Sequence, residues 1–302
     1  MSISSSLRSG DASAGAAAVA GRPVRAAVLI FWDYDTQWGG DRSRSGGGPK
    51  AWGALEFEHT DRLLDIHREY DVPACFAAVG EAGREGRRPY HDPVQLRRIH
   101  AEGHEIGSHS LRHEWLPGLA PDELARAVSE SKTILEQCVG SDVVTFVPPY
   151  NQPFDYPAGL SISLSERREA SSHRNDLGAV CRALGAAGYR FCRVAYRPIA
   201  QRLVEGVLGR RRDRPSRLEA IEGVTCVRLN TPGGFGAETA AVVERCAERG
   251  GLAVVYGHPH SLRAENSQNE ELLKPFLRRV AQLRTEGRIE VLRPKDLLAR
   301  TA

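Results

Sequence analysis

Short apolar runs with the composition of buried strands alternate with helical patterns along most of the chain. Strands that alternate with helices indicate parallel pairing through crossover connections. The alternation therefore predicts an α/β fold whose seven or eight βα units either close into a barrel or form a doubly wound sheet. The expected strands cover residues 27–31, 74–79, 105–107, 143–147, 189–194, 224–229, 252–256 and 289–292, and the expected helices cover residues 58–70, 93–101, 121–138, 175–188, 237–249 and 270–286.

Length and composition favour one domain. The 302 residues, of which 41% are hydrophobic, suffice for one large core, and an α/β barrel of this size is usually a single domain. Residues 1–24 are rich in Ser, Gly and Ala, so we expect a flexible segment there and one domain over residues 25–302. The formal net charge of +3, from 41 basic and 38 acidic side chains, is too balanced to predict a nucleic-acid partner.

The sequence contains no pattern that predicts export or membrane insertion. The apolar stretch Ala16–Ala20 is too short for a signal peptide, and no run reaches the roughly 18 apolar residues that a spanning helix requires. The six cysteines are widely separated and several fall within apolar patterns, which indicates buried thiols in a reducing compartment. We therefore expect a cytoplasmic protein without a transmembrane segment.

Two groups of metal-ligand residue types follow expected strands. Asp33 and Asp35 come at the end of the first strand, and His109 and His113 follow the third. Histidines at positions i and i+4 lie on one face of a helical turn, so both can reach one cation, and a carboxylate from another strand end can complete the set. The same spacing is also common in solvent-exposed pairs that bind no metal. Their position after strands favours the metal site, because α/β folds carry their chemistry at the carboxyl ends of strands.

Four motifs, in this order along the chain, resemble those of the NodB-homology polysaccharide deacetylases, which form carbohydrate esterase family 4. They are Phe31–Thr36, His109–His113, Phe146–Asn151 and Val255–His258. The resemblance covers roughly residues 25 to 298 and implies a distorted (β/α) barrel that forms a single deacetylase domain. The Asp-x-Asp-Thr form of the first motif is similar to that of the branch containing formyl-aminoarabinose lipid deformylases.

The resemblance implies a metal-dependent hydrolase. Asp35, His109 and His113 would hold one divalent cation, most simply zinc, although cobalt, nickel, manganese and iron also accept these ligands. The cation would act as a Lewis acid and lower the pKa of bound water. Asp33 would be the general base and His258 the general acid.

Three further residues are expected in the same pocket. By resemblance, the backbone N–H of Tyr150 would face the oxyanion, while Asn151 would either bind a sugar hydroxyl or belong to a plain turn. His260 lies two residues after His258, so it either shares the pocket or supports it from behind. The choice of His258 as the acid depends on its motif position.

The third motif departs from the family pattern at one position. Val147 stands where the family has an arginine that orients the catalytic aspartate. Arg193 or Arg197, at the end of a later strand, is available to take over that role.

Two segments are interpreted as insertions. Residues 38–48 are rich in glycine and form either a mobile lid beside the site or a plain linker. Residues 210–214 include four arginines without interleaved aromatic residues, which favours a solvated loop over a phosphate site.

These features together predict a metal-dependent N-deacetylase that acts on an amino sugar in an intracellular glycan precursor, a lipid-linked sugar or a glycosylated metabolite. A deformylase of a related sugar would differ only in the size of its acyl pocket. Two other possibilities are a hydrolase of a non-sugar amide or cyclic imide, which the altered third motif suggests, and a carbohydrate-binding protein without activity.

Overall fold

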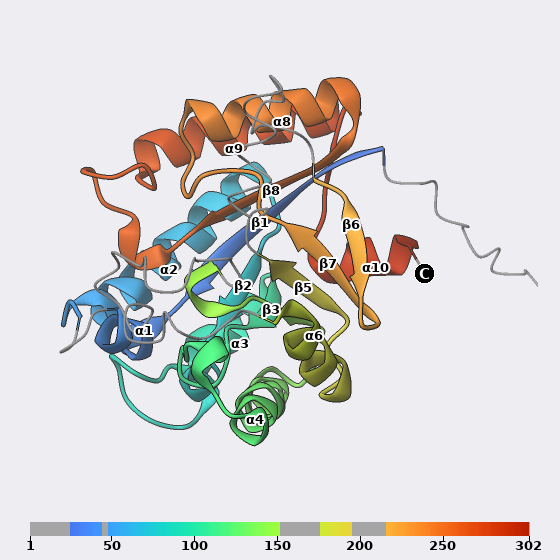
Figure 1. Cartoon of the computed structure of the whole chain (residues 1–302). Coiled ribbons are helices and arrows are strands. Elements are labelled where there is room, and N and C mark those ends of the chain that lie inside the picture. The colour runs from blue at the N-terminus through green and yellow to red at the C-terminus, as the bar shows by residue number, and fades with distance from the viewer. Residues whose placement is uncertain (1–24, 44–47, 152–175, 195–215, 302) are drawn as a thin grey trace, which may run out of the picture.

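The computed structural model describes residues 25–43, 48–151, 176–194 and 216–301 (Figure 1). One sheet of nine strands forms its centre, in the order β6-β7-β5-β4-β3-β2-β1-β8, and β9 also pairs with β1. The strands are β1 (Ala26–Tyr34), β2 (Cys75–Ala78), β3 (Glu105–Ser108), β4 (Thr145–Phe146), β5 (Phe191–Val194), β6 (Leu218–Ile221), β7 (Val224–Arg228), β8 (Gly251–Gly257) and β9 (Glu290–Val291).

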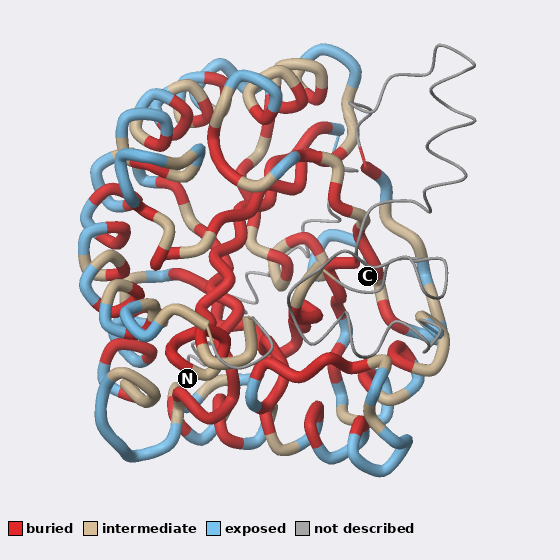
Figure 2. Tube along the Cα trace, turned by 60° about the vertical axis from the view of Figure 1, so that its left-hand side comes forward, coloured by how far each residue is buried: buried red, intermediate tan, exposed pale blue. Residues whose placement is uncertain are grey.

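Helices cover the outside of this curled sheet (Figures 1 and 2). Their inward faces are buried and their outward faces are exposed, as the 3.6-residue period of an amphipathic helix requires (Figure 2). The described helices are α1 (Thr36–Arg42), α2 (Trp52–Tyr70), α3 (Pro93–Ala101), α4 (Pro121–Val139), α6 (Leu177–Ala186), α8 (Ala237–Arg249), α9 (Glu270–Thr285) and α10 (Pro294–Thr301). None of them combines the length and apolar character needed to cross a bilayer.

The two ends of the sheet approach each other, which gives the distorted (β/α) barrel that the sequence predicted. Ser216, just before β6, forms an antiparallel bridge with Leu252 of β8 through hydrogen bonds of 2.7 and 3.0 Å. Beyond β7, the side chain of Asn230 accepts a hydrogen bond from the backbone N–H of Val254 and donates one to the carbonyl of Leu252. These hydrogen bonds of the Asn230 side chain thus take the place of backbone hydrogen bonds to β8 where the barrel closes.

The two faces of β1 separate the core into two parts. Val28, Ile30 and Trp32 belong to the cluster that packs under the helices. Ala27, Leu29 and Phe31 belong to a second cluster, which includes Phe191, Val227 and Val254 from other strands. Because side chains alternate between the faces of a strand, Asp33 continues the second row and Arg193 continues the row of Phe191.

The sheet is not wholly parallel, which corrects the sequence prediction. β6 was not expected, and it runs antiparallel to β7. The two strands are joined by Glu222 and Gly223, whose φ angles of 49° and 80° are typical of a tight hairpin turn. All four residues of β6 are at least partly exposed, so no apolar run marks the strand in the sequence.

Two other expectations about helices need correction. α2 begins at Trp52, six residues before the expected start at residue 58. The first part of the glycine-rich segment 38–48 belongs to the helix α1 and is therefore not a plain linker, while residues 44–47 lie outside the described residues. The predicted N-terminal segment, residues 1–24, also lies outside them, as does the arginine run 210–214.

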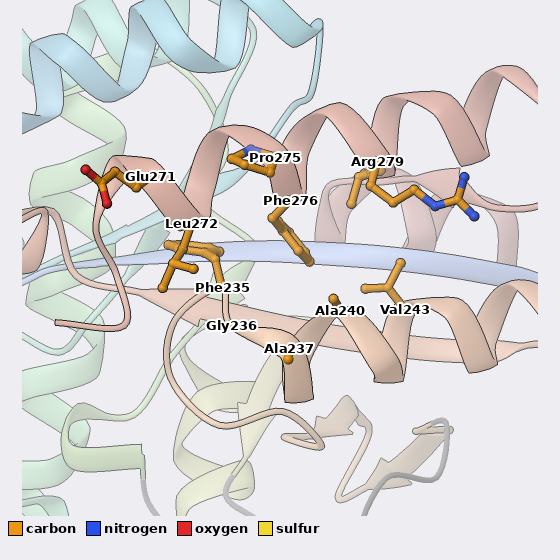
Figure 3. A pocket seen from close by; sticks show the side chains of 11 residues that line it. Phe235, Gly236, Ala237, Ala240, Val243, Glu271, Leu272, Pro275, Phe276 and Arg279 are labelled. Carbon is orange, nitrogen blue, oxygen red and sulfur yellow. The ribbon is translucent and has the colours of Figure 1, made fainter. Parts of the chain in front are cut away.

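A cavity of about 200 Å³ lies between α8 and α9, on the outer layer of the barrel (Figure 3). Its lining is mostly apolar, and it includes Phe235, Phe276 and the partly exposed Leu272. The ring of Phe235 packs against Trp32 of β1, with ring centroids 5.3 Å apart. None of the residues proposed for catalysis lines this cavity.

Candidate metal centre and active site

Asp33 is a buried carboxylate that the chain itself neutralises. It lies within β1, one residue before the strand ends, and Arg193 of β5 donates two hydrogen bonds to it, at 2.8 Å to Oδ1 and 2.6 Å to Oδ2. Both side chains are almost fully buried. Burial alone would raise the pKa of Asp33, but the charges of Arg193, His109 and His258 and the hydrogen bonds from Arg193 together outweigh it, and the pKa lies below its usual value. The fork of the guanidinium therefore keeps Asp33 ionised and fixes its orientation.

Arg193 occupies the role left open by Val147. Its guanidinium lies over the rings of Phe31 and Tyr256, with the central carbon 5.1 and 4.9 Å from the ring centroids. These aromatic walls hold the planar cation in one orientation. Of the two arginines considered from the sequence, Arg193 contacts Asp33, and Arg197 lies outside the described residues.

Asp35, His109 and His113 converge on one point. One possible ligand atom from each residue lies within 4.8 Å of the others, and all three side chains are buried. The Nε2 atoms of His109 and His113 are 3.3 and 3.6 Å from Asp35 Oδ1. That oxygen is buried and has no hydrogen-bond partner within the described structure. Because leaving a buried carboxylate oxygen unsatisfied is costly, this geometry and donor set fit a divalent cation.

The imidazoles are oriented for ligation through Nε2. His109 Nδ1 donates a hydrogen bond of 2.6 Å to the carbonyl of Val147, which leaves Nε2 directed toward Asp35. Burial lowers the pKa of His113 to about 3, even though the charge of Asp35 opposes this shift. His113 is therefore held neutral, as a metal ligand must be.

The segment that carries the two histidines is a turn and not a helix, so the conformation expected from their spacing is wrong. Ser110 and His113 have φ angles of 64° and 62°, in the left-handed region that a helix does not use. Ser131 of α4 donates a hydrogen bond of 2.9 Å to the carbonyl of Ser110, and Gly80 N–H donates another of 2.8 Å. Contacts from other elements thus hold the turn in a conformation that brings both rings to Asp35.

Asp35 is fixed by close packing against α1. A Cβ atom added to Gly39 would lie 2.5 Å from the Cβ of Asp35, so only glycine permits this approach. Thr36, the residue after Asp35, has a φ of 53°. This is strained for a β-branched side chain, and its backbone N–H donates a hydrogen bond of 3.2 Å to Glu56.

His258 lies at the end of β8 and faces the two aspartates. Its Nε2 is 3.8 Å from Asp33 Oδ2, and 26% of its side chain is exposed, which makes it more accessible than the proposed ligands. Its backbone N–H donates a hydrogen bond to the side chain of Gln268. Among the residues expected to carry catalysis, His258 is thus the one placed between solvent and the buried carboxylates.

The third motif forms a wall of the same site. The ring of Tyr150 contacts that of His113, with centroids 4.5 Å apart. Asn151 accepts a hydrogen bond of 3.1 Å from Arg193 and donates one of 3.0 Å to the hydroxyl of Tyr256. Both Tyr150 and Asn151 have positive φ angles, of 59° and 54°, so this is a constrained turn. The side chain of Asn151 is engaged in bracing Arg193.

Glu56 is a site residue that the sequence interpretation missed. It is fully buried in the first turns of α2, and its Oε2 lies 3.3 Å from His260 Nδ1. Burial and the charge of Asp35 raise the pKa of Glu56 well above its usual value. The helix was expected to begin at residue 58, which excluded Glu56. Its spacing from Thr60 and Leu63, which are also buried, is the signal that could have placed it on the inner face.

His260 shares the pocket region but is not equivalent to His258. Its ring is 5.2 Å from that of His258 and stacks on Trp52 at 4.1 Å with an interplanar angle of 14°. Burial lowers the pKa of His260 to about 4, against the opposing charge of Asp35. His260 is thus a buried neutral imidazole that packs against α2.

The fold and this site define an α/β barrel with a metal-ligand cluster beside a buried ion pair. Residues 50–158 match the family described as polysaccharide deacetylase. A peptidoglycan-N-acetylglucosamine deacetylase of Bacillus cereus is 30% identical over 91 residues, which cover 30% of this chain and 39% of that protein. A chitooligosaccharide deacetylase of Sinorhizobium fredii is 29% identical over 92 residues, which cover 30% of this chain and 40% of that protein.

Solved structures agree with the fold over most of the chain. A Mycobacterium smegmatis structure assigned to the polysaccharide deacetylases has a TM-score of 0.61 at 16% identity, and the match covers 91% of this chain and 90% of that one. A mutant of a family 4 pseudoenzyme with restored activity has a TM-score of 0.50 at 16% identity, covering 92% and 70%. Over residues 50–158 the chain is thus similar to the polysaccharide deacetylases, the NodB-homology or carbohydrate esterase 4 family, and its fold agrees with theirs. Because a pseudoenzyme also has this fold, activity must be inferred from the side chains.

Proposed function

We propose that this protein is a metal-dependent N-deacetylase that hydrolyses the N-acetyl group of an amino sugar. The observation that carries the proposal is the contrast within one motif. Asp33 is held ionised by Arg193, whereas two residues later Asp35 directs an unpartnered oxygen toward two imidazoles. A general base next to a set of metal-ligand side chains is what metal-assisted amide hydrolysis requires.

Asp35, His109 and His113 would hold the cation. Their two nitrogen atoms and one carboxylate oxygen suit zinc best, and also suit cobalt, nickel, manganese or iron. When bound, the cation supplies Lewis acidity that polarises the amide carbonyl.

Asp33 and His258 would move the protons. Asp33 accepts a proton from the attacking water, whose oxygen forms a bond to the carbonyl carbon. The C–N bond then breaks, and His258 donates a proton to the departing amine, so that acetate and a free amino sugar are the products. The 3.8 Å between His258 Nε2 and Asp33 Oδ2 supports these two roles, because groups this close can act on the same substrate bond. The backbone N–H of Tyr150 is the proposed donor to the oxyanion.

The proposed substrate is an N-acetylated amino sugar within a glycan, a glycan precursor or a glycosylated metabolite. The names of the relatives support the sugar part of this proposal, because they act on peptidoglycan and on chitooligosaccharides. A formyl group in place of acetyl would need only a smaller acyl pocket. Hydrolysis of a non-sugar amide or cyclic imide stays an alternative because the third motif remains altered, but its other support, the missing arginine, is weakened by the contact of Arg193 with Asp33.

The test is hydrolysis of a substrate panel by the purified protein, with and without added zinc, cobalt, nickel or manganese. The panel contains chitooligosaccharides, peptidoglycan fragments, nucleotide-linked and lipid-linked N-acetyl sugars, their N-formyl analogues, and ureides. We expect release of acetate from at least one sugar, loss of that activity with a chelator and recovery with metal. Turnover of ureides alone, or of nothing after metal reconstitution, would reject the proposal.

A further inference from the structure

Two strained or constrained segments of the site meet at one buried side chain. The first is the backbone that follows Asp35, where Thr36 has a φ of 53°. The second is the segment that follows β8, where His258 precedes a short 3₁₀ turn (Pro259–Ser261) that contains His260. Glu56 Oε2 contacts both, at 3.2 Å from Thr36 N and 3.3 Å from His260 Nδ1.

The surroundings of Glu56 leave it few other roles. Its side chain is fully buried, and its second oxygen, Oε1, has no hydrogen-bond partner within the described structure. Glu56 is not part of the metal-ligand cluster, which is made by Asp35, His109 and His113. Burying a carboxylate is costly, so the contacts of Glu56 with Thr36 and His260 indicate a specific role for this side chain.

His260 is well suited to transmit the position of Glu56 to His258. Its ring is held flat against Trp52, which lies one helical turn before Glu56 on α2. A second tie joins the same elements, because His59 Nδ1 donates a hydrogen bond of 2.9 Å to the carbonyl of Pro259. The first two turns of α2 therefore clamp the segment that carries His258.

We propose that Glu56 and His260 are a positioning pair that fixes the Asp35 segment relative to the His258 segment. Glu56 holds Thr36 in its strained conformation, which sets where the preceding Asp35 points. Through His260, the same carboxylate sets the distance of His258 from Asp33. This inference rests on the proposed roles of Asp35 and His258, and it adds two residues that touch neither the cation nor the reacting atoms.

The test compares Glu56→Ala with Glu56→Gln, and His260→Ala with His260→Asn. Alanine removes both contacts of Glu56, whereas a glutamine oxygen in the place of Oε2 can still accept from Thr36 N–H and from His260 Nδ1–H. Asparagine at 260 can keep an N–H close to the position of Nδ1. Glu58→Ala, on the exposed side of the same helix, is the matched control.

We expect each alanine variant of the pair to lower kcat on an N-acetylated chitooligosaccharide by about 10- to 100-fold at saturating zinc, because small displacements of reacting groups have effects of this order. KM should change by less than about threefold, since the pair does not touch substrate, and bound zinc should stay at the wild-type level. Glu56→Gln and His260→Asn should recover most of kcat. Glu58→Ala should resemble the wild type.

Three results would overturn the pair. One is an unchanged kcat in Glu56→Ala. Another is a Glu56→Gln variant as slow as Glu56→Ala, because the charge and not the position would then matter. The third is loss of zinc at saturation, which would make Glu56 a ligand.

Hydrogen exchange of the metal-free protein separates this inference from the proposed function. Glu56→Ala should speed exchange at Thr36, Ser261 and Leu262, whereas Glu56→Gln should not. If the wild type hydrolyses no N-acetyl sugar, the proposed function fails, and the exchange result still decides the pair. Unchanged exchange in Glu56→Ala would reject the positioning role whatever the activity.

Discussion

Asp33 and Asp35 lie two residues apart and are equally buried, at 2% and 3% exposure, yet their surroundings are opposite. The Asp33 side is complete within the chain, because both carboxylate oxygens accept hydrogen bonds from Arg193. The Asp35 side is incomplete, because Oδ1 has only imidazole nitrogens at 3.3 and 3.6 Å and no hydrogen bond. The surroundings of Asp33 hold an ionised carboxylate in place, whereas the surroundings of Asp35 suit the binding of a cation.

The two sides also differ in what keeps them in shape. Asp33 and Arg193 lie on regular strands of the barrel, where alternation along β1 and β5 directs both side chains to one face. Asp35, Thr36 and the turn from His109 to His113 lie outside strands and include three residues with positive φ. Asp33 is therefore supported by the sheet, whereas the proposed ligand set depends on contacts between loops and helices.

The largest expected effect separates the two aspartates by metal content. Asp35→Ala removes the anionic ligand, so we expect both bound zinc and turnover to fall to background. Asp33→Asn should keep bound zinc while turnover falls by about 10²- to 10⁴-fold, because an amide cannot accept the proton of water at neutral pH. Elemental analysis and acetate release on the same samples check both. Loss of zinc from Asp33→Asn with retention in Asp35→Ala would reverse the assignment.

The next largest effect is expected on the free energy of unfolding when the partner of Asp33 is removed. Arg193→Ala leaves a buried carboxylate without its partner, so we expect the free energy of unfolding to fall by about 3–5 kcal/mol. Arg193→Lys should recover part of the loss, since lysine supplies a charge but not the two-pronged contact. Asp33→Asn in the Arg193→Ala background should also recover stability, because the unpaired charge is gone. Urea unfolding at neutral pH measures the wild type, these three variants and Asp33→Asn alone, and additive effects in the double variant would contradict the pairing.

The fold was largely predictable because its strongest signals are local. Continuous apolar runs marked β1, β2 and β8, and caps and amphipathic spacing gave α3 and α8 with the bounds that the structure has. β6 was missed because its residues are half exposed and its pairing is with a neighbour in a hairpin. An amphipathic edge strand of four residues leaves too weak a pattern to distinguish from a loop.

The sequence indicated which residues form most of the site, but not the backbone conformations and contacts that bring them together. Motif order brought Asp35, His109 and His113 together, and strand alternation was consistent with Arg193 as the partner of Asp33. The spacing of His109 and His113 suggested a helical turn, but four residues can also bring two rings together through left-handed conformations, and sequence spacing does not distinguish these. Glu56 was missed because its role depends on contacts with residues 20 and 204 positions away.

A smaller effect should appear on the Asp35 side when its packing is disturbed. Gly39→Ala places a Cβ 2.5 Å from that of Asp35, so the ligand must shift. We expect zinc affinity to fall by about 10- to 100-fold, as for other residues that orient a ligand. Gly185→Ala in α6 is the matched control, because its new Cβ meets nothing closer than 3.6 Å, and it should leave zinc affinity unchanged. Zinc titration with a competing chelator compares them, and equal affinity in the two variants would show that Asp35 is not held by this contact.

The smallest expected effect concerns the turn that carries the histidines. Ser131→Ala removes the hydrogen bond from α4 to the carbonyl of Ser110 and the partner of Ser108 Oγ at 2.7 Å. The carbonyl of Ser110 still accepts from Gly80 N–H, so we expect a loss of only about 1 kcal/mol in the free energy of unfolding. Zinc affinity should fall by a few-fold, because the carbonyl of Ser110 in this turn loses one of its two donors. Ser129→Ala, on the exposed face of the same helix, should change neither quantity. If Ser131→Ala lowered stability while zinc affinity stayed at the wild-type value, the turn would be rigid without α4, and the ligand set would depend less on neighbouring helices than the contrast with Asp33 implies.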